Sequence, residues 1–400
     1  RPPPRSTLFP YTTLFRSPVT SQTVCRNSST AAVTFSGAVP GTVYNWTNTN
    51  TAIGLAASGT GNIASFVGQN AGTAPISGTI TVTPSYTNNG VTCTGASTSF
   101  TITINPTPTV SAVPAQVLCN GAATTAVTFS GTVPGTTFNW TNSAPSIGLA
   151  ASGSGNIGSF TAVNTGGAPV IATITVTPVF TNNGVSCSGS TASFTITVNP
   201  TAQVNQPADV ITCGGAPTSV TLTTATPGTT YSWTNSNPAI GLAASGTGNI
   251  SFIAATVAVQ TVATVTVTPN YTNSGVSCPG TPRTFTITVN PLPTVNPVGN
   301  QTNCSGEGTV AVTFTGSLPG TVFNWTNNNA SIGLAASGTG NINSFITQNT
   351  TPNIQVATVT VTPVFNVTGG SCSGTPITFT FTVYPRPLVN VGPDIAICQN

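Results

Sequence analysis

The sequence predicts an all-β protein made of tandem two-sheet domains. Thr, Ser, Asn, Gly and Val dominate its composition, and β-branched side chains pack well on the pleated surface of a sheet. Several stretches alternate strictly between aliphatic residues and Thr, which is the pattern of a strand with one buried face. The same landmarks return along the chain in steps of 94, 94, 91 and 94 residues, and this length is near that of one β-sandwich domain.

The repeat is marked by a cysteine, a tryptophan and a second cysteine. The first cysteines are Cys25, Cys119, Cys213 and Cys304, followed by Cys398 in a further, incomplete unit. A tryptophan comes 20 or 21 residues later, at Trp46, Trp140, Trp233 and Trp325, and the second cysteines are Cys93, Cys187, Cys278 and Cys372. Such a period is longer than one coil of a solenoid, so each unit is expected to be a domain.

Proline-bearing joins separate the units, and proline both ends strands and stiffens linkers. We therefore expect an elongated, semi-rigid rod and a sequence truncated at both ends. The predicted organisation is a leader at 1–17, repeat 1 at 18–106, repeat 2 at 107–200, repeat 3 at 201–291, repeat 4 at 292–385 and the start of a fifth repeat at 386–400. Residues 7–17, TLFPYTTLFRS, resemble a translated sequencing adapter, so the leader is interpreted as artefactual or unstructured.

Within repeat 1, alternation predicts strands at 32–35, 43–46, 79–83 and 100–104. The sequence Asn88-Asn89-Gly90 predicts a hairpin before the last strand. Two antiparallel sheets packed face to face fit these strands, with Trp46 and its three equivalents in the cores. A tryptophan at the centre of a strand is more often core than ligand platform, because burying so large a ring dominates the energetics of a small domain.

Charged side chains are almost absent. The chain has six arginines, three acidic residues and no Lys, His or Met, and its net charge of +3 comes from three arginines within the first 17 residues. The repeats are therefore neutral and contain no cluster of basic residues. Nucleic acids and anionic membranes are excluded as partners, because binding to them requires such clusters. No apolar stretch approaches the roughly 18 residues of a membrane-spanning helix.

No catalytic residue, cofactor site or metal site is predicted. Without histidine, no Ser or Cys nucleophile has an imidazole base, and the few carboxylates lie in different repeats, so they form no catalytic pair. The most faithfully repeated segment, IGLAASGTGNI at 53–63, is Gly-rich but lacks the Lys-Ser/Thr of a phosphate loop. We interpret this segment as a tight structural loop.

Regular cysteine spacing in a chain without histidine indicates disulfides rather than zinc ligands. Two pairings are considered: within repeats, as in Cys25 with Cys93, or across linkers, as in Cys93 with Cys119. If both cysteines of a repeat lie at the same pole, only the first pairing suits the ~5.5 Å Cα separation of a disulfide. We therefore predict bonds within repeats, with Cys398 left unpaired, and an oxidising, extracellular or cell-surface location.

These residues resemble bacterial PKD-like, immunoglobulin-like repeats. The resemblance lies in the Tyr-x-Trp strand at 44–46, the TVTP strand with its Asn-Gly turn and cysteine, and the closing strand TFTITVNP at 284–291, and it covers residues 18–400. The family's Trp-Asp-x-Gly-Asp run is replaced by WTNTN after Trp46, so acidic or calcium-linked roles are not carried over. The resemblance implies spacers or adhesive stalks in large bacterial surface or secreted proteins.

Three functions are compatible with the sequence. The leading interpretation is a non-catalytic structural or adhesive stalk, with surface glycans or other cell-surface proteins as candidate partners. The repeats also resemble accessory spacers of secreted hydrolases, whose catalytic domain would lie elsewhere in the protein. Rows of Thr such as 264–268 are compatible with a glycan- or ice-binding array, although half-buried strands alternate in this way by default.

Overall fold

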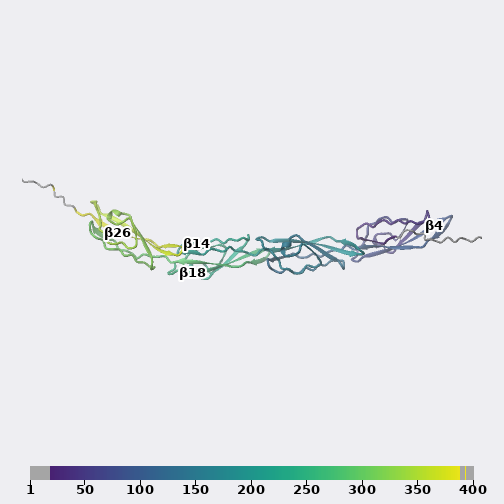
Figure 1. Ribbon diagram of the computed structural model, residues 1–400, viewed down its shortest axis with the longest axis horizontal. Coiled ribbons are helices and arrows are strands. Elements are labelled where there is room, and N and C mark those ends of the chain that lie inside the picture. The colour runs from purple at the N-terminus through teal and green to yellow at the C-terminus, as the bar shows by residue number, and fades with distance from the viewer. Residues whose placement is uncertain (1–18, 388–391, 393–400) are drawn as a thin grey trace, which may run out of the picture. The chain divides into compact units, whose positions relative to one another are not determined.

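The computed structural model describes residues 19–387 and residue 392. The leader at 1–17 and Cys398 lie outside the described residues. Strands joined by turns and short loops account for the described chain, and its helices are single 3₁₀ turns of three residues (Figure 1). None of the helices in the described part is long and apolar enough to cross a membrane.

Each repeat contains the same six strands and one 3₁₀ turn, and repeat 3 has two further strands, β14 and β17. Repeat 1 has β1 (Gln22–Cys25), β2 (Val43–Asn48), η1 (Thr51–Ile53), β3 (Ser58–Thr60), β4 (Ile76–Asn88), β5 (Val91–Thr94) and β6 (Thr98–Asn105). Repeat 2 has β7 (Gln116–Cys119), β8 (Thr137–Asn142), η2 (Pro145–Ile147), β9 (Ser152–Ser154), β10 (Val170–Asn182), β11 (Val185–Ser188) and β12 (Ala192–Asn199).

The second half of the chain follows the same plan. Repeat 3 has β13 (Val210–Cys213), β14 (Pro217–Val220), β15 (Thr230–Asn235), η3 (Pro238–Ile240), β16 (Ser245–Thr247), β17 (Ile250–Ile253), β18 (Thr261–Asn273), β19 (Val276–Pro279) and β20 (Arg283–Asn290). Repeat 4 has β21 (Gln301–Cys304), β22 (Val322–Asn327), η4 (Ala330–Ile332), β23 (Ser337–Thr339), β24 (Gln355–Val367), β25 (Gly370–Ser373) and β26 (Ile377–Tyr384).

The chain forms two compact units. One comprises Arg1–Thr201 with Thr272–Cys278, and the other comprises Ala202–Tyr271 with Pro279–Asn400. The first unit thus holds the sheets of repeats 1 and 2, and the second holds most of repeat 3 and all the described strands of repeat 4.

The main sheet of each repeat has one parallel edge. In repeat 1 the strand order is β1-β6-β4-β2-β3, and β5 pairs with the far end of β4. Strand β1 runs parallel to β6, whereas the other pairings of this sheet are antiparallel. The hairpin turn predicted at Asn88-Asn89-Gly90 is confirmed: Asn89 and Gly90 have φ of 50° and 82°, which matches the left-handed conformation of a type I′ turn.

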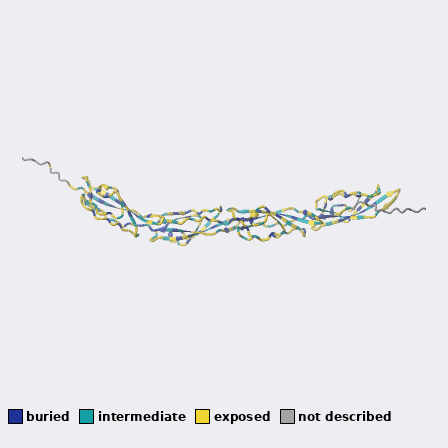
Figure 2. Cartoon of the chain, in the orientation of Figure 1, coloured by how far each residue is buried: buried dark blue, intermediate teal, exposed yellow. Residues whose placement is uncertain are grey.

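A short second layer closes each sandwich. In repeat 3 it consists of β14 paired with β17, and in repeat 1 isolated bridges join Ser29 to Val67 and Val33 to Ile63. Side chains from both layers fill the core, so that buried positions alternate with exposed ones along the strands (Figure 2). The fold is therefore a tandem of immunoglobulin-like β-sandwiches.

The tryptophans lie in these cores, each directly opposite a glycine. Trp46, Trp140, Trp233 and Trp325 are only 7–8% exposed. On the neighbouring strand, Gly59, Gly153, Gly246 and Gly338 face them, and a Cβ atom on any of these glycines would overlap the indole ring. The glycine of the Ser-Gly-Thr/Ser triplet is therefore required by the ring that covers it.

Asparagines hold the rest of the repeated glycine-rich segment in place. Asn48 donates to the carbonyl oxygens of Leu55 and Ala56, and Asn62 accepts from the backbone N–H of Phe35 in the second layer. The bond from Asn48 to Leu55 has equivalents in repeats 2, 3 and 4, and so does the bond from Phe35 to Asn62. Gly54 at the end of η1 has φ of 96°, which favours glycine. The segment thus connects the two layers.

The parallel edge strand is fixed by a polar side chain just before it. Asp209 accepts a 2.7 Å hydrogen bond from the backbone N–H of Thr286 on β20, and Ser21 and Asn300 make the same bond in repeats 1 and 4. The hydrogen bond from the Thr286 backbone holds the pKa of the Asp209 carboxyl below its usual range, and a hydrogen bond from the Thr286 side chain lowers this pKa further.

Lowering pH is expected to weaken this attachment in repeat 3. A carboxylate whose pKa is depressed by folding contributes stability above its unfolded pKa, about 3.9, and loses that contribution as pH falls through the folded value. We expect hydrogen exchange at Thr286 to increase below pH 4 in the native chain. Asp209→Asn keeps the acceptor oxygen without the charge and should remove this pH dependence; an unchanged pH profile in the variant would contradict the assignment.

Candidate functional site: the junctions between repeats

The disulfides join different repeats. Cys25 bonds to Cys187, Cys119 to Cys278 and Cys213 to Cys372, with Cα separations of 5.5, 5.5 and 5.7 Å. In each case the first cysteine of one repeat bonds to the second cysteine of the next. The predicted pairing within repeats is therefore wrong, and so is the alternative across the linker, because neither Cys25–Cys93 nor Cys93–Cys119 forms.

The parallel edge strand explains why bonds within repeats do not form. Because β1 runs parallel to β6, Cys25 lies opposite Asn105 at the carboxyl end of β6. Cys93 instead lies opposite Tyr86 on the β4–β5 hairpin, ahead of the start of β6. The length of β6, eight residues or about 26 Å at the rise of a strand, therefore separates them. The assumption that both cysteines share a pole was the error.

Two of the cysteines predicted to form bonds are unpaired. Among the described residues, Cys93 and Cys304 are free and exposed. Cys93 is the second cysteine of repeat 1, and Cys304 is the first cysteine of repeat 4. In the pattern of the other three bonds, Cys93 would pair with a cysteine of a preceding repeat and Cys304 with a cysteine of a following repeat. Cys398 lies outside the described residues.

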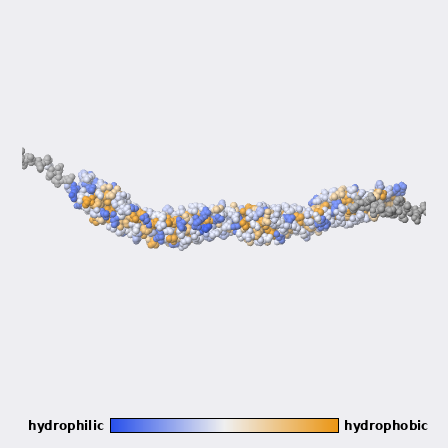
Figure 3. Space-filling model, in the orientation of Figure 1, coloured by the Kyte–Doolittle hydropathy of each residue, from blue (hydrophilic) through white to orange (hydrophobic). Residues whose placement is uncertain are grey.

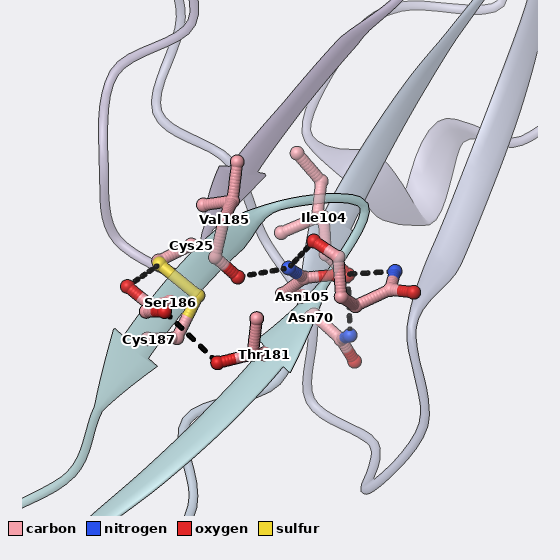
Figure 4. The surroundings of a disulfide bond; sticks show 9 residues. Cys25, Asn70, Ile104, Asn105, Thr181, Val185, Ser186 and Cys187 are labelled. Atoms are coloured by element: carbon pink, nitrogen blue, oxygen red, sulfur yellow. Dashed lines mark hydrogen bonds between the residues drawn. A yellow bond between two sulfur atoms is a disulfide. The ribbon is translucent and has the colours of Figure 1, made fainter.

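The junction between repeats 1 and 2 combines a covalent bond with an amide pair (Figure 4). The tip of the β10–β11 hairpin carries Asn182, whose amide donates a 2.9 Å hydrogen bond to the side-chain oxygen of Asn105. Asn105 in turn donates to the carbonyl oxygens of Asn182 and Val185 at 3.3 and 3.4 Å, and it is fully buried. The hairpin of repeat 2 therefore docks on the carboxyl end of β6, beside the disulfide.

The other two junctions keep the bond and vary the polar contact. Asn273 donates to Asn199 at 2.8 Å in the junction that holds Cys119–Cys278. In the junction that holds Cys213–Cys372, Val367 stands where repeat 2 has Asn182, and the oxygen of Asn290 accepts from Gln260 of its own repeat. The disulfide forms at all three junctions, so the amide pair is not a requirement for it.

A crevice remains at the junction of repeats 3 and 4. Its volume is about 430 Å³. The walls from repeat 3 are Ala258, Val259, Gln260, Asn290 and Pro291, and those from repeat 4 are Leu318 and Phe365–Thr368. The β24–β25 hairpin of repeat 4 thus covers the loop before β18 and the start of the linker after β20.

Glycine is required where the linker crosses the hairpin strand. A Cβ atom on Gly189 would overlap the carbonyl oxygen of Pro108, and Gly280 and Gly374 meet the carbonyl oxygens of Ala202 and Pro293 in the same way. The Cys-x-Gly sequence of the hairpin therefore lets the incoming linker lie directly on the hairpin's backbone.

Replacing Gly189 by Ala should displace the linker of repeat 2. We expect overpacking against backbone to destabilise this attachment by about 1–3 kcal/mol, measured as faster hydrogen exchange in residues 109–118. Gly158→Ala is the matched control, because no atom lies within 4 Å of a Cβ built there. Equal exchange in the two variants would show that the linker does not depend on the close approach.

The described residues contain no group of three or more potential metal ligands. The ligand-binding Thr array predicted at 264–268 stays a prediction, but in repeat 1 two hydroxyls of the equivalent row on β4 are hydrogen-bonded to serines of the same repeat. Thr81 and Thr83 bond to Ser99 and Ser97 at 3.0 and 2.8 Å. On the face drawn in Figure 3, hydrophilic and hydrophobic residues are interspersed.

Comparisons with known proteins yield distant similarities. No family model matches the sequence, and no curated protein matches it. Solved structures include immunoglobulin domains 1–5 of Sidekick-1, with 13% identity over 93% of this chain and 80% of that chain and a TM-score of 0.32. The insect immune protein hemolin has 15% identity, coverages of 92% and 98% and a TM-score of 0.24. The human desmocollin-1 ectodomain has 12% identity, coverages of 96% and 84% and a TM-score of 0.27. At these values the similarity carries no information on function.

Proposed function

We propose that the chain is a non-catalytic spacer or stalk of an extracellular or cell-surface protein, in which the disulfides restrict extension under force. The observation that supports this proposal is the pairing of the cysteines. Each bond joins consecutive repeats, and each bond begins before the previous one has closed: Cys119 precedes Cys187, and Cys213 precedes Cys278.

This overlap creates a short covalent path between Cys25 and Cys372. Tension entering at Cys25 crosses to Cys187, follows the backbone to Cys213 and crosses to Cys372. Only the segment from Cys187 to Cys213 carries load along its backbone, whereas the remaining residues between Cys25 and Cys372 lie outside the shortest path. If each repeat were instead an independent domain with an internal disulfide, tension would pass along the backbone of every linker.

The other properties of the chain support a spacer outside the cell. Disulfides persist in oxidising compartments, and the absence of histidine leaves no imidazole for catalysis. The resemblance to bacterial PKD-like repeats supports a bacterial surface or secreted protein in which other regions make the specific contacts. Surface proteins or glycans are the partners we propose for those regions.

Single-molecule pulling tests the proposal. Handles attached at the two termini measure the contour length released from the chain with its disulfides intact and after reduction. A contour length that does not change on reduction would overturn the proposed restriction of extension.

A further inference from the structure

The hairpins that carry the disulfides differ in how they are held without the covalent bond. At the junction of repeats 1 and 2, a buried amide holds the β10–β11 hairpin through both its oxygen and its nitrogen. Asn105 accepts from the side chain of Asn182 and donates to the carbonyl oxygens of Asn182 and Val185. These three hydrogen bonds would still join the two repeats if the neighbouring disulfide were reduced.

The equivalent amide at the junction of repeats 3 and 4 makes no bond to the hairpin. Its side-chain oxygen, on Asn290, accepts from Gln260 of the same repeat, and the Val367 side chain has no polar group to offer. The Asn290 amide nitrogen is buried and has no hydrogen-bond partner among the described residues. Burial of an unpaired donor is unfavourable, so opening this junction relieves a cost, whereas opening the first junction breaks hydrogen bonds.

Apolar contacts do not replace the missing amide pair. Ile211 on β13 lies close to Gly369 at the tip of the β24–β25 hairpin, but it remains 48% exposed. Val259, which lines the crevice at this junction, is 71% exposed. The hydrophobic effect scales with the apolar area removed from water, so side chains this exposed add little to docking. The hairpin of repeat 4 is therefore held on repeat 3 mainly by its disulfide.

We propose that Cys213–Cys372 is a redox-sensitive hinge. Its reduction frees the β24–β25 hairpin of repeat 4 from repeat 3, whereas the β10–β11 hairpin of repeat 2 stays docked on repeat 1 when Cys25–Cys187 is reduced. The inference is independent of the proposed spacer role, because it concerns the chain without load.

The junction of repeats 2 and 3 lies between these two cases. Asn273 donates to the side-chain oxygen of Asn199, but the amide nitrogen of Asn199 is buried without a hydrogen-bond partner among the described residues. Reduction should therefore loosen this junction more than the first and less than the third.

The chemical step is thiol–disulfide exchange with a dithiol reductant. One thiolate of the reductant attacks a sulfur of the protein disulfide and releases the other cysteine as a thiolate. The second thiolate of the reductant then attacks the mixed disulfide and releases the remaining cysteine. The protein disulfide is reduced to two thiols, which take up the two protons that the reductant loses as it is oxidised to a cyclic disulfide.

The second cysteine of each bond reports on docking. Cys187 and Cys372 are at most 2% exposed in the closed junctions, whereas Cys93, at the same place on the hairpin of repeat 1, is exposed. The full chain is reduced with dithiothreitol, freed of reductant without air and treated with iodoacetamide, and peptide mass spectrometry gives the alkylation rate of each cysteine relative to the unfolded chain. Cys372 should react within about threefold of Cys93, and Cys187 about tenfold or more slowly, because three hydrogen bonds keep its junction closed.

Reciprocal variants separate the amide pair from other differences between the junctions. Val367→Asn supplies the missing amide and should slow alkylation of the cysteine in its own hairpin about tenfold, and Asn182→Val should accelerate alkylation in its hairpin by about the same factor. Asn88→Val is the matched control on the hairpin of repeat 1 and should leave alkylation of the cysteine in that hairpin unchanged. The hinge is overturned if Cys187 and Cys372 react at equal rates in the reduced native chain, or if neither reciprocal variant changes its rate.

Discussion

Under force, the fully extended covalent path between Cys25 and Cys372 should be about 90 Å long in the oxidised chain and about 1,200 Å long in the reduced chain. The first value is that of the roughly 26 residues from Cys187 to Cys213 at about 3.5 Å per residue, and the second is that of the whole interval. The difference follows from the overlap of the disulfides, because Cys25–Cys187 and Cys213–Cys372 bypass most of the four repeats. Force spectroscopy with terminal handles measures both lengths.

Pairs of cysteine variants separate the overlapping arrangement from any other. Removing Cys25 and Cys187 diverts the path through Cys119–Cys278 and should lengthen the extensible part to about 159 residues, or about 550 Å. Removing Cys119 and Cys278 is the matched control, since the shortest path does not cross that bond and the released length should stay near that of the native chain. Equal lengthening in both variants would be the result expected for bonds within repeats and would contradict the pairing.

The alternation of residues along the strands was a good guide to the fold. The strands predicted around Trp46 and at 79–83 and 100–104 are parts of β2, β4 and β6, because burial of one face leaves a period of two in the sequence. The region 32–35 forms only a bridge at Val33. Its pairing depends on contacts with the second layer, which local alternation does not encode.

The junctions could not be derived from spacing because the direction of the first strand is not written in its sequence. Strand β1 has only four residues, all of intermediate burial, so it has no alternation to reveal its partner. Its parallel pairing with β6 moves Cys25 to the opposite end of the repeat from Cys93. The alternation that continues through β4 to Asn88 was the available signal, since it indicates a hairpin that extends beyond the main sheet.

The stability of each repeat depends on the ring of its tryptophan and the glycine beneath it. Trp140 belongs to the buried cluster of repeat 2, lies opposite Gly153 and donates a 3.1 Å hydrogen bond to the carbonyl oxygen of Gly155. Replacing a buried aromatic ring by Ala removes about 3–5 kcal/mol of stability. Adding a methyl group at Gly153 instead forces the ring from its position and should destabilise the repeat by about 1–3 kcal/mol.

A double-mutant cycle separates this contact from a general intolerance of Gly153 to substitution. In the Trp140→Ala background the space above Gly153 is free, so Gly153→Ala should have little further effect, whereas independent effects would add. The free energy of opening is measured by native-state hydrogen exchange in β10 and β12, with the peptides of repeat 4 as an internal reference. Gly158→Ala, at a site without neighbours within 4 Å, should leave this value unchanged. A Gly153→Ala loss of the same size in both backgrounds would show that the glycine is needed for its backbone and not for the ring it faces.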